Sequence, residues 1–179
     1  VPAEYDLVKA KFYFDRAGVN SIDLYTSETA GSSANDIALT FQQSAMGAAE
    51  INVIKTPSDG FWSNIWMQNP MTMSGWQARP TVDAFLTLAH MNGGSWNETM
   101  WGSEQFDAMI IAARAELDEA VRAQMYCDML HMMNDDGGFV NAVFQNQLEA
   151  TAKNVMGWTP HSVGGLGGFG QTLRNVWLA

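Results

Sequence analysis

Residues 21–55, SIDLYTSETAGSSANDIALTFQQSAMGAAEINVIK, contain the pattern that decides the fold. Ile22 and Leu24 alternate with polar neighbours in SIDLYT, which predicts a strand, and EINVIK at the other end predicts a second strand. Between them, Ile37 and Phe41 belong to an apolar series at helical spacing. We therefore expect a strand, a helix and a strand in succession.

The flanking sequence extends this order in both directions. Upstream, residues 5–18 predict a helix that Asp6 caps and Gly18 ends in the left-handed conformation. Downstream, MTMSGW (71–76) predicts a third strand, and the pattern of residues 77–102 is weaker, with proline and glycine interrupting it.

The last third of the chain predicts mostly helices. Ser103 caps one helix, and a second runs over about residues 118–135. FVNAVFQ (139–145) predicts a fourth strand, and a glycine-rich tail ends in a short apolar strand. The whole order predicts the α/β class, with helices flanking a mixed sheet.

Composition narrows the class of protein. The chain has 179 residues, 47% of them apolar, which is a globular composition with enough length for a hydrophobic core. Its formal charge of −10 argues against nucleic acid as a partner, because such a surface repels phosphate. No run of about 18 apolar residues indicates a membrane span. The single cysteine, Cys127, lies in an apolar helical pattern that predicts a buried thiol.

Three patterns resemble cofactor or metal sites, and each has a plainer interpretation. GLGGFG (165–170) has the G-x-G-x-x-G spacing but lacks the strand before it and the helix after it that a dinucleotide site requires. The methionines of residues 125–133 have the spacing of a helical core face. His131 and Asp135 are four residues apart, but no third metal ligand is evident. We expect no cofactor, no metal site and no catalysis.

The aromatic residues of the middle third are more informative. Trp76 and Trp96 lie beside glycine or asparagine at a predicted strand end and in a loop, where α/β proteins place ligand sites. The residues alone leave a core role and a ligand-wall role equally open. Near Trp76 lies Arg79, one of only nine Lys and Arg residues.

Five motifs occur along the chain in a fixed order: YDLVKAKFYFDRAG (5–18), INVIKTPSDGFW (51–62), GWQARPTVD (75–83), GGSWNET (93–99) and the helical stretch 106–140. Together they resemble the C-terminal lobe of the solute-binding proteins of bacterial ABC importers, the extracellular family 5 that includes dipeptide, oligopeptide and nickel binders. The resemblance covers nearly the whole chain. Tyr13 and Phe14 stand where two leucines are usual.

The resemblance implies a periplasmic-binding-protein-like lobe, one half of a clamp that closes on a peptide-like or other small solute. Residues 1–149 would form lobe II, and residues 150–179 a tail that returns across the hinge to lobe I. The absent N-terminal lobe and the ABC permease subunits would then be partners, in the periplasm or at the outer face of the membrane. The sequence begins at Val1 without Met, which predicts a processed protein or part of a longer one. An exposed cleft face also predicts a homodimer of the chain.

The same resemblance gives Arg79 a role. Relatives that hold the free amine of a peptide usually have Asp at this position, so the expectation of a peptide ligand is weakened. A guanidinium fork suits a carboxylate or phosphate. Two roles stay open: Arg79 binds an anionic group of the ligand, or it pairs with Asp83 and shapes the loop. Trp76, Trp96 and Asn97 are the other predicted residues of the cleft wall.

The alternative function is a freestanding carbohydrate-binding or scaffold domain that uses the tryptophan cluster.

Overall fold

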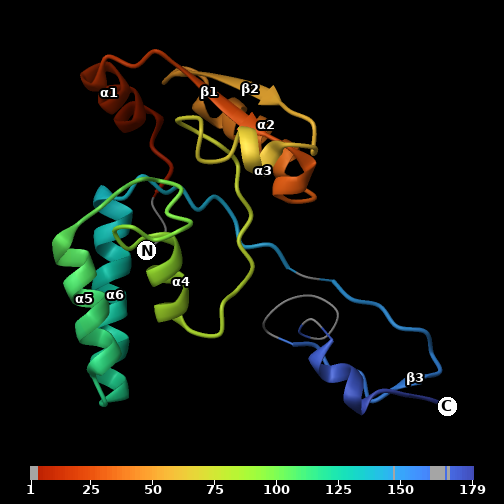
Figure 1. The fold of residues 1–179 in the computed structure, drawn as a ribbon. Helices are drawn as coiled ribbons and strands as arrows, with labels where there is room; N and C mark the ends of the chain where they lie inside the picture. The colour runs from red at the N-terminus through yellow and green to blue at the C-terminus, as the bar shows by residue number, and fades with distance from the viewer. Residues whose placement is uncertain (1–3, 147, 162–167, 169) are drawn as a thin grey trace. The chain divides into compact units, whose positions relative to one another are not determined.

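The computed structural model describes residues 4–146, 148–161, 168 and 170–179 (Figure 1). The chain forms two compact units, Val1–Gly75 and Trp76–Ala179. None of the helices within the described residues combines the length and the apolar character needed to cross a bilayer.

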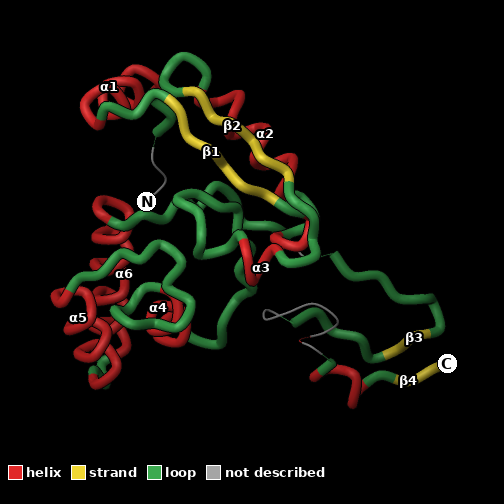
Figure 2. Tube along the Cα trace, turned by 45° about the horizontal axis from the view of Figure 1, so that its top comes forward, coloured by secondary structure: helices red, strands yellow, loops and turns green. Residues whose placement is uncertain are grey.

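The first unit is built on two parallel strands, β1 (Ser21–Thr26) and β2 (Glu50–Lys55), joined by helix α2 (Ala34–Ala45). Figure 2 shows the two strands side by side, with α2 running along them. Leu24 of β1 and Ile51 of β2 are buried against Ala38 of α2, which is why these positions are apolar. The predicted strand–helix–strand order is confirmed.

A third segment lies along the other edge of β1. The amide of Tyr25 donates to the carbonyl oxygen of Met71 (3.1 Å), and the amide of Met73 donates to that of Tyr25 (2.7 Å). The pairing amounts to a single parallel bridge between Tyr25 and Thr72, so the strand predicted over MTMSGW is largely wrong. The segment then passes so close to the carbonyl oxygen of Ala30 that Gly75 has no room for a Cβ.

Three short helical segments complete the first unit. Helix α1 (Leu7–Ala17) has the predicted ends: the Asp6 side chain accepts from the Lys9 amide, and Gly18 is left-handed with φ 67°. Helix η1 (Glu28–Ala30) follows β1, and α3 (Phe61–Asn64) follows β2. Phe61 is fully buried against Ala30 and Ala34, which ties both segments to the start of α2.

The second unit is mainly helical. Helices α4 (Val82–Ala89), α5 (Glu104–Ala115) and α6 (Glu119–Asp136) each begin with a side-chain cap, from Thr81, Ser103 and Asp118 respectively. The last two confirm the sequence prediction. Sequence reasoning missed α4, because its eight residues form only two turns between proline and glycine.

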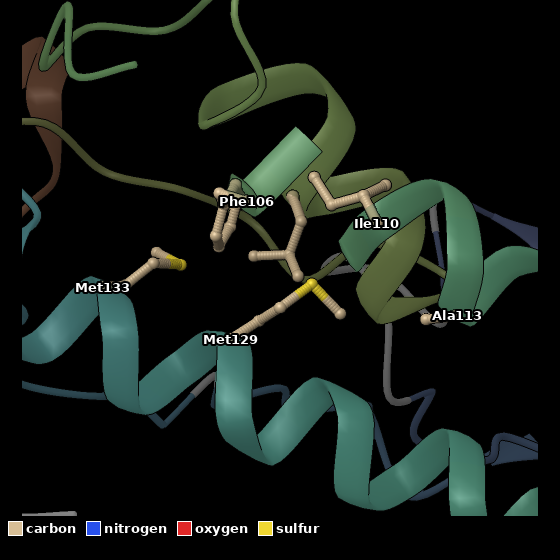
Figure 3. Close-up of a cluster of buried hydrophobic side chains, with 6 residues drawn as sticks. Phe106, Ile110, Ala113, Met129 and Met133 are labelled. Atoms are coloured by element: carbon tan, nitrogen blue, oxygen red, sulfur yellow. The ribbon is translucent and has the colours of Figure 1, made fainter. Parts of the chain in front are cut away.

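The core of this unit lies between α4, α5 and α6 (Figure 3). Phe106, Ile110 and Ala113 of α5 recur at helical spacing and are fully buried with Leu86 of α4. Met129 and Met133 point from α6 toward α5 and fill the remaining space. The prediction that the methionines form a core face is confirmed. Further methionines pack at the margin of this core, namely Met91, Met109, Met125 and Met132.

Two predictions for this unit were wrong. Residues 139–145 contain no strand, because they pair with no strand among the described residues, and the side chains of Val140, Val143 and Phe144 are exposed. Cys127 is exposed rather than buried. It follows the core-facing Met125 by two positions, which turns it about 200° away around the helix axis.

The tail forms a small antiparallel pair. Strand β3 (Val155–Met156) pairs with β4 (Trp177–Leu178), and helix η2 (Gln171–Asn175) precedes β4. The short terminal strand was predicted. With a parallel pair in one unit and an antiparallel pair in the other, the described residues have the α/β class that was predicted, with helices and small sheets.

Ile110 and Ile111 offer a matched test of the core. Ile110 is fully buried and its neighbour Ile111 is 55% exposed on the same helix. We expect Ile110→Ala to lower the free energy of unfolding by about 2–5 kcal/mol, because it leaves a cavity in the core. Ile111→Ala should change it by less than about 1 kcal/mol. Urea denaturation of the two variants measures both values, and equal effects would contradict this core.

Candidate ligand-binding site

Trp76 is the centre of an aromatic cluster on the two loops that flank α4. Its indole Nε1 donates to the Glu98 carboxylate at 2.7 Å. Its ring meets the Phe85 ring of α4 edge-on, with centroids 5.2 Å apart, and the Trp96 ring at 5.8 Å. The indole is therefore held from both the helix and the loop that follows it.

Arg79 lies over the same two tryptophans. Its guanidinium carbon is 5.3 Å from the centroid of the Trp76 ring and 6.0 Å from that of Trp96, both within cation–π range. Nη1 donates to the carbonyl oxygen of Gln77 at 3.2 Å. Contacts with two side chains and one backbone carbonyl thus restrain the half-buried guanidinium of Arg79, in a chain whose net charge is −10.

Asp83 pairs with a different arginine, so the predicted Arg79–Asp83 pair is wrong. Nε of Arg114 lies 3.1 Å from the Asp83 carboxylate, and Nη2 is at the same distance. The same guanidinium donates to Thr87 at 2.9 Å. Asp83 and Thr87 belong to α4 and Arg114 to α5, so these contacts join two helices. Of the two roles considered for Arg79, ligand binding is the one that stays a prediction.

Asn97 holds the loop that carries Trp96. It is buried, and its amide nitrogen donates to the carbonyl oxygens of Met91 (3.3 Å) and Trp101 (2.7 Å). Its amide oxygen accepts from the Thr99 hydroxyl at 3.0 Å. These contacts fix the loop and use both the nitrogen and the oxygen of the Asn97 amide within the protein. Trp96 itself is 44% exposed, as a residue of a ligand wall must be.

Sequence reasoning missed the acceptor and the ring that support Trp76, namely Glu98 and Phe85. Glu98 is one of nineteen acidic residues, and no spacing rule singles it out. Phe85 belongs to α4, which was not predicted. Its edge-on contact with Trp76 depends on a helix of two turns that the local sequence pattern did not reveal.

His90 contacts the cluster through the Phe85 ring. It is buried between the rings of Phe85 and Phe139, at centroid distances of 5.3 and 5.4 Å, and its Nε2 has no hydrogen-bond partner in the described part of the chain. Burial lowers the pKa of His90 below its ordinary value, and the negative charge of Glu98 opposes this in part. Neutral histidine is therefore the form that the folded chain favours.

The described residues contain no group of three or more His, Cys, Asp and Glu side chains placed to hold a metal ion. Most of GLGGFG, residues 165–167 and 169, lies outside the described residues. The candidate site therefore consists of a restrained guanidinium and two indole rings. These groups can bind a ligand non-covalently, by hydrogen bonding and stacking.

A scan with protein-family models finds no match to the sequence, and a search of curated proteins finds none either. Solved structures do match. The oligopeptide-binding protein AppA from Bacillus subtilis, in complex with a nonapeptide, is similar over 100% of this chain and 40% of its own, with a TM-score of 0.75 and 16% identity.

Two further structures are similar over the larger part of the chain. The ABC transporter-associated periplasmic binding protein DppA from Helicobacter pylori, in complex with the peptide STSA, is similar over 76% of this chain and 28% of its own (TM-score 0.62, 23% identity). NikZ from Campylobacter jejuni, in complex with Ni(L-His), is similar over 73% and 30% (TM-score 0.61, 14% identity).

These matches confirm, at the level of the fold, the resemblance to family 5 solute-binding proteins that the motifs indicated. AppA and DppA are named as binding proteins, and NikZ was solved in complex with Ni(L-His). The chain spans between about a quarter and two fifths of the length of these three structures.

The buried histidine gives a test by pH. Because the folded chain keeps His90 neutral, the stability that this provides is complete above the ordinary histidine pKa of about 6.5 and is lost as pH falls toward the lowered pKa of the folded state. We expect the free energy of unfolding to decrease between pH 7.5 and pH 5.5 by more in the native chain than in His90→Phe. His131→Gln, which changes an exposed histidine of α6, is the control. Identical pH dependence of the native chain and His90→Phe in urea denaturation would refute the buried neutral histidine.

Proposed function

We propose that this chain is the second lobe of a solute receptor that serves an ABC importer. The receptor closes on a small solute between two lobes and delivers it to permease subunits in the membrane, in the periplasm or at the outer cell surface, without chemical conversion. The observation that carries the proposal is the likeness of the whole chain to part of an oligopeptide-binding protein, at a TM-score of 0.75.

Residues 1–149 form the lobe in this proposal, and residues 150–179 return toward the first lobe. Closure of two rigid lobes about a hinge brings both faces of a cleft onto the ligand. One lobe alone supplies only part of the contacts, so we expect the isolated chain to bind about a thousandfold more weakly than a two-lobed receptor.

The ligand meets the lobe at Trp76, Arg79 and Trp96. The guanidinium is already oriented by the indoles and by the Gln77 carbonyl, so little side-chain entropy is lost when it binds. Its planar donor edge fits two oxygens of a carboxylate or phosphate. A small anionic solute, or a peptide through its carboxylate, is the ligand class that this group favours.

The geometry gives less support to the alternative of a carbohydrate-binding domain. A sugar platform needs open faces on the aromatic rings, and here the Arg79 guanidinium lies over both indoles. A cation in that position favours an anion over a neutral sugar.

The tetrapeptide Ser-Thr-Ser-Ala, as free acid and as C-terminal amide, provides a direct test. We expect the indole N–H signals of Trp76 and Trp96 to shift in NMR titrations with the free acid. Arg79→Ala should weaken binding of the acid by about tenfold or more, since hydrogen bonds to charged groups contribute about 1.5–3 kcal/mol. The affinity of Arg79→Lys for the free acid should lie between those of the native chain and Arg79→Ala, because lysine keeps the positive charge and lacks the paired donors of the guanidinium.

Arg174→Ala is the matched control, since it removes an exposed arginine that also donates to a backbone carbonyl, that of Gln171. The amide peptide should bind native and Arg79→Ala chains equally. If the acid binds Arg79→Ala as tightly as the native chain, the anion-binding role of Arg79 is wrong.

A further inference from the structure

We propose that Glu98 is the positioning residue of this site: it fixes the Trp76 indole and, through the indole, the guanidinium of Arg79. The inference rests on the proposed function only for its consequence, namely that Arg79 meets the ligand. The arrangement of Glu98, Trp76 and Arg79 is a property of the chain that can be measured without any ligand.

The contacts around Trp76 come from separate segments. Phe85 of α4 meets the ring edge-on, which limits its tilt. That contact alone does not fix which edge of the indole turns toward the protein. An aromatic ring packs against any edge of the indole and forms no hydrogen bond that would select one. The Glu98 carboxylate fixes this edge, since it accepts a hydrogen bond from Nε1–H, the one N–H group of the indole ring.

The distance supports a strong bond. At 2.7 Å, Nε1 and the carboxylate oxygen are closer than in an ordinary N–H···O bond of about 2.9–3.0 Å, as expected when the acceptor is ionised. Both side chains are partly shielded from water, which strengthens the interaction further.

The same bond favours the position of Arg79. A hydrogen bond donated to an anion leaves the indole more electron-rich, and the attraction of a cation to a ring grows with the negative charge on its face. Arg79 lies over that face, 5.3 Å from the ring centroid. Glu98 therefore acts on Arg79 in two ways, through the orientation of the ring and through its electron density.

A purely electrostatic role for Glu98 would have the opposite effect on an anionic ligand. A carboxylate near the guanidinium reduces the positive potential, so its removal would strengthen anion binding. If Glu98 instead positions Trp76 and Arg79, loss of its carboxylate weakens the binding of an anionic ligand. The two roles are separated by Glu98→Ala, which removes the acceptor, and Glu98→Gln, which keeps an acceptor oxygen and removes the charge.

The test is an NMR measurement on the full 179-residue chain. In the native chain, we expect the side-chain protons of Arg79 to be shifted upfield by the indole rings, and the Trp76 indole N–H to exchange slowly with solvent. Glu98→Ala should lose most of the upfield shift, and Glu98→Gln should keep most of it. Glu149→Ala is the matched control, because Glu149 accepts from the Nε1 of Trp158 at 3.2 Å in the same chain.

An unchanged Arg79 shift in a folded Glu98→Ala chain would overturn the inference. So would an indole N–H of native Trp76 that exchanges as fast as a free indole, a result that needs no variant. Titration with Ser-Thr-Ser-Ala is a separate readout: we expect Glu98→Ala to bind about tenfold more weakly than the native chain. If the Arg79 shift depends on Glu98 and the native chain binds no peptide, the proposed contact between Arg79 and a peptide carboxylate is wrong and the positioning role of Glu98 holds.

Discussion

The attachment of α4 to α5 is the constraint on which the candidate site depends. Leu86 enters the core beside Phe106 and Ile110, and the Asp83–Arg114 pair with Thr87 joins the polar sides of the two helices. The loop with Trp76 and Arg79 leads into α4, and the loop with Trp96 and Glu98 leads out of it. An eight-residue helix has little stability of its own, so packing rather than propensity holds both loops in place.

The cluster also shows how a strongly acidic chain can present a local cation. The Arg79 guanidinium contacts two indole rings, and the nearby carboxylate of Asp83 pairs with Arg114 instead. An ion pair would have lowered the ability of the guanidinium to attract an anion. Contact with indole faces restrains the side chain and leaves its charge in place.

The sequence predicted those elements whose determinants are local. The caps of α1, α5 and α6 are single residues with a side-chain acceptor, and the strands around α2 show the alternation of a half-buried pair. The strand expected at 139–145 failed because a strand needs a partner, and apolar β-branched residues alone do not provide one. Helix α4 was missed for the converse reason, since its stability comes from contacts distant in sequence.

The same division applies to the site. The tryptophan-rich loops and Arg79 were evident from residue type and position, whereas the partner of Asp83 is 31 residues away and the partner of Trp76 is 22 residues away. No local pattern encodes such pairs. Asn97 shows the limit most clearly, because an amide beside an exposed tryptophan suggested a ligand contact, and its buried position assigns it to the loop itself.

The exposed thiol of Cys127 has a practical consequence for labelling the chain. It is the sole cysteine of the 179 residues and stands on the solvent side of α6. A maleimide fluorophore would therefore attach at one defined point without mutagenesis. In the two-lobed receptor proposed above, a second dye on the other lobe would let the efficiency of energy transfer report opening and closing of the cleft in real time.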